Sequence, residues 1–492
     1  MKSSASGPPS PDHEMSAPVA AAGDESQAAP PRRPKPQKGR PVELAITTLA
    51  FGGQGLGRLD DFVVFVDGAV PGDVVRAVVT RTKKRYAEAR LEEILQPSPD
   101  RLDARCGHFG GCGGCRWQSL DYGVQLRYKE QQVRDSLERL GGLRDFVLEP
   151  IRGMDDPWRY RNKVEFSIGS HHGRLVVGFH PPGLWDRVLP LSECHLLPAA
   201  TEGVRTTTEE WLREAGLEPW NARALTGYAR HLAVREAAGT GEVLVNLVTA
   251  PGELPGAESF VTAIRTHHPE VVGILHSTNA GTAEVATGLP HETLWGRPYL
   301  NEQLGGLTLK ISISAFFQTN TRMAETLYAV AAAEADLTGG EVVWDLYSGI
   351  GSIALYLAGK AKAVLGIELV EAAVRDAQAN AEANDIDNAT FLKGDARVIL
   401  KEVLEGRLEL PLGLEHPDVI VVDPPRAGLA HKVIARVAAA RPARIVYVSC
   451  NPSTLAPNAA LFAEAGYRLT RLTPVDMFPH TPHIEAVALL EP

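Results

Sequence analysis

The chain has 492 residues, of which 44% are hydrophobic, and its formal net charge is -10 at pH 7. A chain of this length exceeds one hydrophobic core, so several domains are expected, and charges interrupt its apolar stretches well before the ~20 residues that a membrane-spanning helix needs. The acidic balance excludes a uniformly basic nucleic-acid binder, although local basic patches such as RTKKRYAEAR at 81–90 and WRYRNK at 158–163 can still bind RNA.

Residues 1–40 are rich in Pro, Ala, Ser and Gly and lack the continuous apolar core of a signal peptide. This composition predicts a disordered tail with a basic end. We therefore expect a cytoplasmic protein without membrane segments.

Residues 41–98 contain the short strand patterns VELAIT, FVVFVD, DVVRAVVTRT and AEARLEEIL, separated by the Gly-rich FGGQGLGR and by Asp-Gly and Pro-Gly turns. Several short strands in so few residues predict a small β-barrel. Such OB-like barrels often bind RNA on one face, and an SH3-like interaction module fits the pattern equally well.

The next segment contains a cysteine loop, CGHFGGCGGC. Its Cys106, Cys112 and Cys115, together with the distant Cys194, offer four thiolates. An odd total of five cysteines, three of them within ten residues, indicates a metal site in a cytoplasmic protein rather than a disulfide framework. Four thiolates suit either tetrahedral zinc or an iron-sulfur cluster.

The remainder divides into two α/β regions. A helix is predicted over YGVQLRYKEQQVRDSLERL, ending at Gly141 and Gly142. Strand patterns such as KVEFSIG, LVVGFH, EVLVNLVT and GILHST then predict a mixed α/β central domain. With the cysteine loop included, this domain is expected to span residues 99–305. Residues 306–492 alternate strands and helices, which predicts a doubly wound, Rossmann-like parallel sheet.

The first strand of that last domain ends in DLYSGIGSIAL, a Gly-rich turn that lets a ligand approach the backbone. The turn lacks the third glycine of the dinucleotide fingerprint. In addition, VIVVDPPRAG resembles the fourth motif of S-adenosylmethionine methyltransferases. The residues that in this order suggest the cofactor site are Asp345, Gly349, Gly351, Glu368, Asp395 and Asp423.

Methyltransferases of this class that act on amines have a motif that resembles Asp/Asn-Pro-Pro followed by an aromatic residue. In this chain Arg426 follows the two prolines instead. Cys450 ends the strand RIVYVS at the carboxyl edge of the sheet, where cofactor and acceptor would meet. A thiolate can activate C5 of a pyrimidine by adding to C6, and a base must then remove the C5 proton. Glu485 in MFPHTPHIEAV is the candidate base, while His480 and His483 could replace or orient it.

Taken together, SCNP, DPPRAG, FFQTN, DLYSGIGSIAL and HTPHIE resemble the RNA 5-methyluridine (uracil-C5) methyltransferases from about residue 41 to the end. The resemblance implies an N-terminal TRAM barrel, Cys450 as nucleophile and Glu485 as proton acceptor. It also implies that a 4Fe-4S cluster is bound by Cys106, Cys112, Cys115 and Cys194. For S-adenosylmethionine it implies contacts from Gln318, Tyr347, Gly349, Ser352, Glu368, Asp395 and Asp423, although some members have Phe and Asn in place of Tyr347 and Ser352.

The same resemblance implies an RNA substrate, and 23S ribosomal RNA is favoured over transfer RNA. It also implies a monomer without an obligate protein partner. The target base must leave its stack to be methylated. Phe316 and Phe317 are candidates to stack on it, although such a pair is more often core, and Arg161 and Lys163 are candidate RNA contacts. An RNA cytosine-C5 methyltransferase and a non-catalytic RNA-binding or RNA-folding protein are the competing hypotheses.

Overall fold

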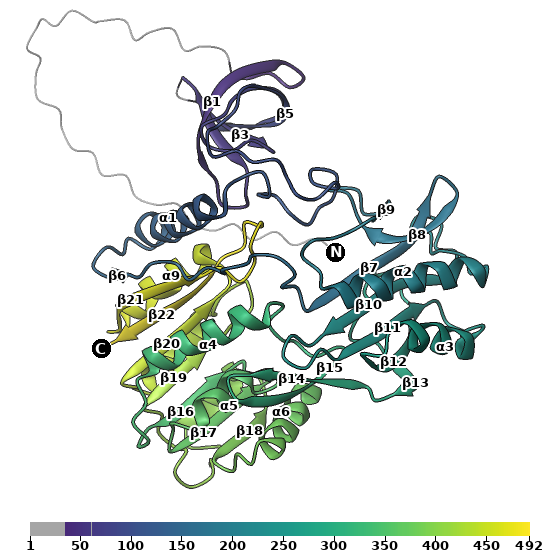
Figure 1. The fold of residues 1–492 in the computed structure, drawn as a ribbon. Coiled ribbons are helices and arrows are strands. Elements are labelled where there is room, and N and C mark those ends of the chain that lie inside the picture. Colours follow the sequence, from purple (N-terminus) through teal and green to yellow (C-terminus); the bar gives the residue numbers. More distant parts are fainter. Residues whose placement is uncertain (1–34, 61) are drawn as a thin grey trace, which may run out of the picture.

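The computed structural model describes residues 35–60 and 62–492, so most of the expected tail lies outside the described residues. Figure 1 shows a small barrel, in purple, beside two larger α/β units. The helices that the structure describes include none long and apolar enough to cross a bilayer.

The N-terminal unit is a closed barrel with the strand order β1-β2-β3-β5-β4. Its strands are β1 (Pro41–Leu49), β2 (Gly55–Leu59), β3 (Phe62–Asp67), β4 (Val74–Thr82) and β5 (Tyr86–Gln96). The predicted barrel is confirmed, but the prediction that all of FGGQGLGR is a turn is wrong, because β2 begins inside it. A Cβ on Gly57 would lie 2.4 Å from the Ala45 carbonyl oxygen. Glycine there allows β2 to pair closely with β1 and is not a sign of a turn.

Helix α1 (Tyr122–Leu140) follows the cysteine loop and has the predicted bounds. The Asp121 carboxylate caps its N-terminus by accepting a hydrogen bond from the Val124 amide. Val133 and Leu137 on its buried face pack into the core of the C-terminal unit, against α9. Although it precedes the central sheet in sequence, α1 therefore packs with the last unit.

The central unit is a sheet of mixed direction with the strand order β13-β12-β11-β10-β7-β8-β9. Its strands are β7 (Lys163–His171), β8 (Arg174–Phe179), β9 (Leu189–Pro190), β10 (Ala229–Glu236), β11 (Val243–Thr249), β12 (Val271–Thr278) and β13 (His291–Gly296). Helices α2 (Ala199–Glu214) and α3 (Ala257–His267) pack on one face of this sheet. A separate hairpin of β14 (Tyr299–Leu304) and β15 (Leu307–Ser312) leads into the last unit.

The C-terminal sheet has the strand order β18-β17-β16-β19-β20-β22-β21-β6. Its strands are β6 (Val147–Leu148), β16 (Val342–Leu346), β17 (Ala363–Glu368), β18 (Ala389–Lys393), β19 (Val419–Val422), β20 (Arg444–Ser449), β21 (Arg468–Val475) and β22 (Glu485–Glu491). The five neighbouring strands β18, β17, β16, β19 and β20 are parallel as predicted. Strand β22, in contrast, runs antiparallel to both β20 and β21. The expectation of a wholly parallel sheet was therefore wrong at this edge, where β21 and β22 form a hairpin that no crossover helix separates.

Alternate residues of each parallel strand enter different cores, which makes the sheet doubly wound. Val343 of β16 packs in a core with helices α4 (Thr321–Ala335), α5 (Ser352–Ala358) and α6 (Glu371–Ala383). Its neighbour Trp344 packs on the opposite face with α1, α7 (Ala396–Leu404), α8 (His431–Ala439) and α9 (Pro452–Glu464). The order of winding reverses between β16 and β19, so their carboxyl ends open a crevice at this switch point.

Candidate active site

The Gly-rich turn after β16 has a strained backbone. Tyr347, Gly349 and Gly351 have φ angles of +71°, +54° and +81°. The left-handed region is costly for a residue with a side chain, and such strain is typical of ligand-binding turns. The Gly349 amide donates to Glu368 Oε2 over 3.0 Å, which ties the turn to the end of β17.

Beside this turn lies a large cavity of about 1090 Å³. Six of the residues predicted to bind the cofactor line it: Gln318, Tyr347, Gly349, Ser352, Glu368 and Asp423. A single small ligand typically occupies a pocket of ~300–1,000 Å³. The cavity is thus large enough for a cofactor together with part of a second molecule.

Buried carboxyl groups dominate the cofactor end of the cavity. Burial, together with repulsion from Asp423, raises the pKa of Asp345 to about 8, and burial raises the pKa of Asp423 to about 7. Asp345 Oδ1 and Ser348 Oγ are buried without a hydrogen-bond partner among the described residues. Acids that repel one another, beside unsatisfied polar atoms, fit a ligand that bears positive charge and hydrogen-bonding groups, as S-adenosylmethionine does.

Asp395, by contrast, does not line the cavity among the described residues. Its carboxylate caps helix α7 through the Arg397 amide and pairs with the Arg397 guanidinium over 2.5 Å. These contacts lower its pKa. The structure therefore places Asp395 outside the lining of the cavity, although its charge acts on Tyr347, which lines it.

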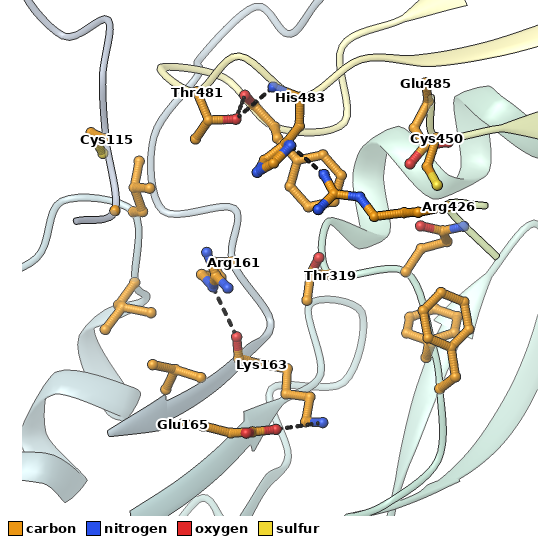
Figure 2. A pocket seen from close by; sticks show the side chains of 18 of the residues that line it. Cys115, Arg161, Lys163, Glu165, Thr319, Arg426, Cys450, Thr481, His483 and Glu485 are labelled. Carbon is orange, nitrogen blue, oxygen red and sulfur yellow. Dashed lines mark hydrogen bonds and ion pairs between the residues drawn. The ribbon is translucent and has the colours of Figure 1, made fainter. Parts of the chain in front are cut away.

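Cys450 and Glu485 lie next to each other at the edge of the sheet. Cys450 follows β20 and Glu485 begins β22, and Ser449 and Ala486 are paired across these strands. Figure 2 shows both side chains on the same side of the cavity. Chain reversal in the last hairpin therefore brings together the two residues expected to do the chemistry.

Both groups favour their protonated forms in the folded protein. Burial, together with the charges of Glu485 and Asp423, raises the pKa of the Cys450 thiol to about 11, and the Arg426 charge opposes this shift. Burial and Asp423 raise the pKa of Glu485 well above the usual range, and Arg426 opposes this shift. Glu485 Oε2 is buried and has no hydrogen-bond partner in the described part of the chain. This oxygen is therefore available to form a hydrogen bond with a bound ligand.

Arg426 is the cation that opposes both shifts, and its environment fixes its position. Its Nη2 donates to His483 Nδ1 over 2.6 Å (Figure 2). Burial and the Arg426 charge lower the pKa of His483 to about 4, so this imidazole is a neutral acceptor at physiological pH. The carbonyl of Arg426 accepts from Asn451 Nδ2 over 3.1 Å. The sequence had shown Arg426 only as a departure from another motif.

The two candidate histidines have different positions. His483 lines the cavity, whereas His480 is not among the described residues that line it. His480 is buried against α1 and Trp158, and its ring stacks on the Trp158 indole at a centroid distance of 3.9 Å. Gln125 Nε2 contacts His480 Nδ1 over 3.2 Å. This geometry supports a positioning role for His483 and leaves His480 without access to the acceptor.

The paired phenylalanines also differ. Both line the cavity, but Phe317 is 4% exposed and packs in the core, while Phe316 is 70% exposed. The expectation that such a pair belongs to the hydrophobic core therefore holds only for Phe317. Arg161 and Lys163 lie in the wall from the central unit, where Lys163 Nζ pairs with Glu165 over 3.0 Å (Figure 2).

The four predicted cluster ligands line the far end of the same cavity: Cys106, Cys112, Cys115 and Cys194. Burial, together with the charges of the other three thiols, raises the pKa of Cys115 to about 12. The described residues nevertheless contain no group of three or more His, Cys, Asp or Glu side chains placed to hold a metal ion. The four thiols share one wall of the cavity.

A second cavity of about 460 Å³ meets the first at Cys450. Cys450, Arg426 and His483 line both cavities. The outer wall of the second cavity consists of Phe51 from the barrel and Arg116 from the cysteine loop. Neither was a candidate in the sequence, because no motif surrounds either residue.

Comparison with known proteins gives concordant matches. The profile of the tRNA (uracil-5-)-methyltransferase family matches residues 299–492, and that of the TRAM domain matches residues 35–91. A protein of Halalkalibacterium halodurans described as an uncharacterised RNA methyltransferase is 37% identical over 92% of this chain and 96% of its own length. A similarly described protein of Chlorobaculum tepidum is 39% identical over 92% and 97%.

Among solved structures, the tRNA (uracil-54, C5)-methyltransferase of Pyrococcus abyssi in complex with S-adenosyl-L-homocysteine matches with a TM-score of 0.73. The two sequences are 29% identical, and the match covers 91% of this chain and 100% of the Pyrococcus abyssi chain. The likeness therefore includes the barrel and the central unit as well as the C-terminal sheet.

Proposed function

The chain belongs to the S-adenosylmethionine-dependent RNA methyltransferases of the uracil-C5 type, and from this premise we propose that it methylates C5 of a specific uridine through a covalent bond between Cys450 and C6. The observation that supports this mechanism best is that Cys450 and Glu485 line the same acid-rich cavity, directly beside the paired residues Ser449 and Ala486 of β20 and β22. S-adenosylmethionine supplies an electrophilic methyl group when bound.

The chain's own residues perform the remaining chemistry. The Cys450 thiolate forms a bond to C6, and the electrons of the C5–C6 double bond move to C5, which then forms a bond to the methyl carbon as the methyl–sulfur bond breaks. Glu485 takes the C5 proton, the double bond re-forms, and the C6–sulfur bond breaks to return the thiolate. Arg426 favours the ionised form of both residues, because its charge lowers both pKa values.

For the cofactor we propose contacts from Gln318, Tyr347, Gly349, Ser352, Glu368, Asp395 and Asp423. The first five of these and Asp423 line the cavity. Tyr328, which the sequence did not suggest, also lines the cavity, and its hydroxyl lies 2.9 Å from Ser352 Oγ at the start of α5.

We further propose that Cys106, Cys112, Cys115 and Cys194 hold a 4Fe-4S cluster rather than zinc. All four side chains line one wall of the first cavity, and the charges of the other three contribute to the raised pKa of Cys115. A 4Fe-4S cluster takes four thiolates, one on each iron. Such a cluster would fix the cysteine loop against the active site.

The test is transfer of labelled methyl from S-adenosylmethionine to unmodified 23S ribosomal RNA and transfer RNA in parallel, followed by nucleoside analysis. Our first candidate is ribosomal RNA, whereas the Pyrococcus abyssi relative is described as acting on transfer RNA. Label in 5-methyluridine supports the proposal and identifies the RNA class. Label in 5-methylcytidine, or in neither RNA, would contradict it. An RNA substituted with 5-fluorouridine, which cannot lose its C5 substituent as a proton, should remain bonded to Cys450.

A further inference from the structure

The second cavity, at the junction of all three units, is separate from the cofactor site. The loop between β1 and β2 supplies Phe51, the cysteine loop supplies Arg116, and the C-terminal unit supplies Arg426 and Cys450. Because Cys450 lies in the wall of both cavities, a molecule in the second cavity directly adjoins whatever is bonded to the nucleophile.

The two cavities differ in charge. Among the described residues, the charged groups lining the second cavity are two arginines, Arg116 and Arg426. The first cavity includes Glu165, Glu193, Asp345, Glu368, Asp423 and Glu485 against Arg161, Lys163 and Arg426. A polyanion is therefore favoured in the second cavity, and a cationic cofactor in the first.

The aromatic ring at the mouth of the second cavity is held on a fixed loop. Phe51 is 50% exposed, although the loop on both sides of it is tied down. Trp117 Nε1 donates to the Gly53 carbonyl over 3.1 Å, and Arg116 Nη1 donates to the Gly52 carbonyl over 3.2 Å. A Cβ on Gly53 would lie 3.1 Å from Pro482 Cβ, so the loop also packs against the segment that leads to Glu485.

An exposed aromatic ring on an ordered loop, beside two cations, is the arrangement with which proteins bind a nucleotide of a single strand. Stacking on an aromatic ring accepts any base, and the arginines accept the phosphate. Arg116 also pairs weakly with the exposed Asp67 over 3.5 Å, a contact that leaves its remaining donors available. Nucleotides of one strand are covalently joined, so the neighbour of a uridine held at Cys450 must lie within one nucleotide of it.

We propose that the second cavity binds the nucleotide adjoining the target uridine, with the phosphate between Arg116 and Arg426 and the base against Phe51. The inference rests on the proposed function, because it takes the uridine to be bound at Cys450. It gives the barrel a direct part in the active site, since Phe51 would hold the strand as the target base enters the first cavity.

The test uses equilibrium binding, measured by fluorescence anisotropy, of two labelled probes of equal length: an oligouridine and an abasic ribose-phosphate oligomer. Phe51→Ala should weaken binding of the oligouridine roughly 5- to 100-fold and leave binding of the abasic oligomer unchanged. Phe51→Trp, which retains a ring, should bind both as the wild type does. Arg116→Gln should weaken binding of both probes and reduce the slope of log K against log salt by roughly 0.7.

Equal binding of oligouridine by the wild type and by both Phe51→Ala and Arg116→Gln would overturn the inference. Equal weakening of both probes by Phe51→Ala would also overturn it, because a stacking role requires a base. Methyl transfer is measured separately on the same proteins. A wild type that binds oligouridine but forms no 5-methyluridine would contradict the proposed function, whatever the variants bind.

Discussion

Replacing Lys129 by Met should destabilise the protein and slow methyl transfer, although Lys129 lies outside both cavities among the described residues. Its ammonium group donates to Asp476 Oδ1 over 2.5 Å and to the Phe478 carbonyl over 3.0 Å. Both side chains of the ion pair are 0% exposed. The pair joins α1 to the segment 476–484, which contains His483 and leads into Glu485.

The magnitude follows from the burial of the pair. Removing one partner of a buried ion pair leaves the other charge uncompensated and costs about 3–5 kcal/mol. The Asp476 carboxylate keeps the Tyr122 hydroxyl, at 2.9 Å, and the Phe478 amide, at 3.2 Å, so the lower half of this range is expected. Burial lowers the pKa of Lys129, although the charge and the hydrogen bond of Asp476 oppose this shift.

Urea unfolding followed by tryptophan fluorescence measures the loss of stability, and hydrogen exchange of residues 476–485 shows where it occurs. The matched control is Lys129→Met combined with Asp476→Asn, which removes both charges. Since a neutral pair leaves no buried charge, the double variant should be more stable than Lys129→Met alone. The kcat for methyl transfer should fall in Lys129→Met, while the KM for S-adenosylmethionine stays near that of the wild type.

Two results would refute this reasoning. If Lys129→Met unfolded at the same urea concentration as the wild type, the ion pair would not stabilise the fold. If the double variant lost as much stability as the two single variants together, the two side chains would act independently.

Four further outcomes are expected. Cys450→Ala should abolish methyl transfer and the adduct with 5-fluorouridine RNA but leave binding of S-adenosylmethionine intact; residual turnover above background would exclude a covalent mechanism. Activity at saturating substrates should increase as pH rises, because nucleophile and base both act deprotonated and both pKa values are raised; Arg426→Gln should move the profile to higher pH, and an unmoved profile would contradict the role of its charge. Gly351→Ala should cost more stability than Gly349→Ala in thermal unfolding, because both have positive φ but only at Gly351 would a Cβ meet a neighbouring ring, at 2.8 Å. Anaerobically purified protein should be brown with broad absorption near roughly 400 nm, and Cys115→Ser should reduce its iron content; stoichiometric zinc in a colourless protein would exclude the cluster.

The features that the sequence predicted well depend on local patterns. The bounds of α1 follow from its apolar spacing, the Asp121 cap and the terminal glycines, all of which act within one or two turns. The approach of Cys450 to the Gly-rich turn also follows from the sequence, because parallel strands place their carboxyl ends at one edge. The roles proposed for these residues remain predictions.

The features that the sequence did not predict depend on contacts between distant segments. Strand β2 resembles a turn in sequence because its glycines, Gly55 and Gly57, lie close to the carbonyl oxygens of Ala69 and Ala45, which belong to other segments of the barrel. The position of Asp395 depends on Arg397, a competing partner that a motif does not reveal. Phe51 and Cys450 meet only because the barrel packs against the cysteine loop, and neither segment contains a pattern that specifies the other.

The segment 476–484 explains why a methyltransferase sheet alone would not form this active site. Segments from earlier in the chain hold it in place. The amides of Arg116 and Trp117 donate to the His480 carbonyl over 2.9 and 3.1 Å, and the Tyr160 hydroxyl donates to the Pro479 carbonyl over 3.0 Å. His480 itself has a φ of +64°, a conformation that persists only where its surroundings impose it. Because Glu485 follows directly, the cysteine loop, α1 and the chain before β7 together fix the start of β22. Loss of any one of these supports should therefore impair the base before it affects the cofactor site, which the sheet and its own turn position independently.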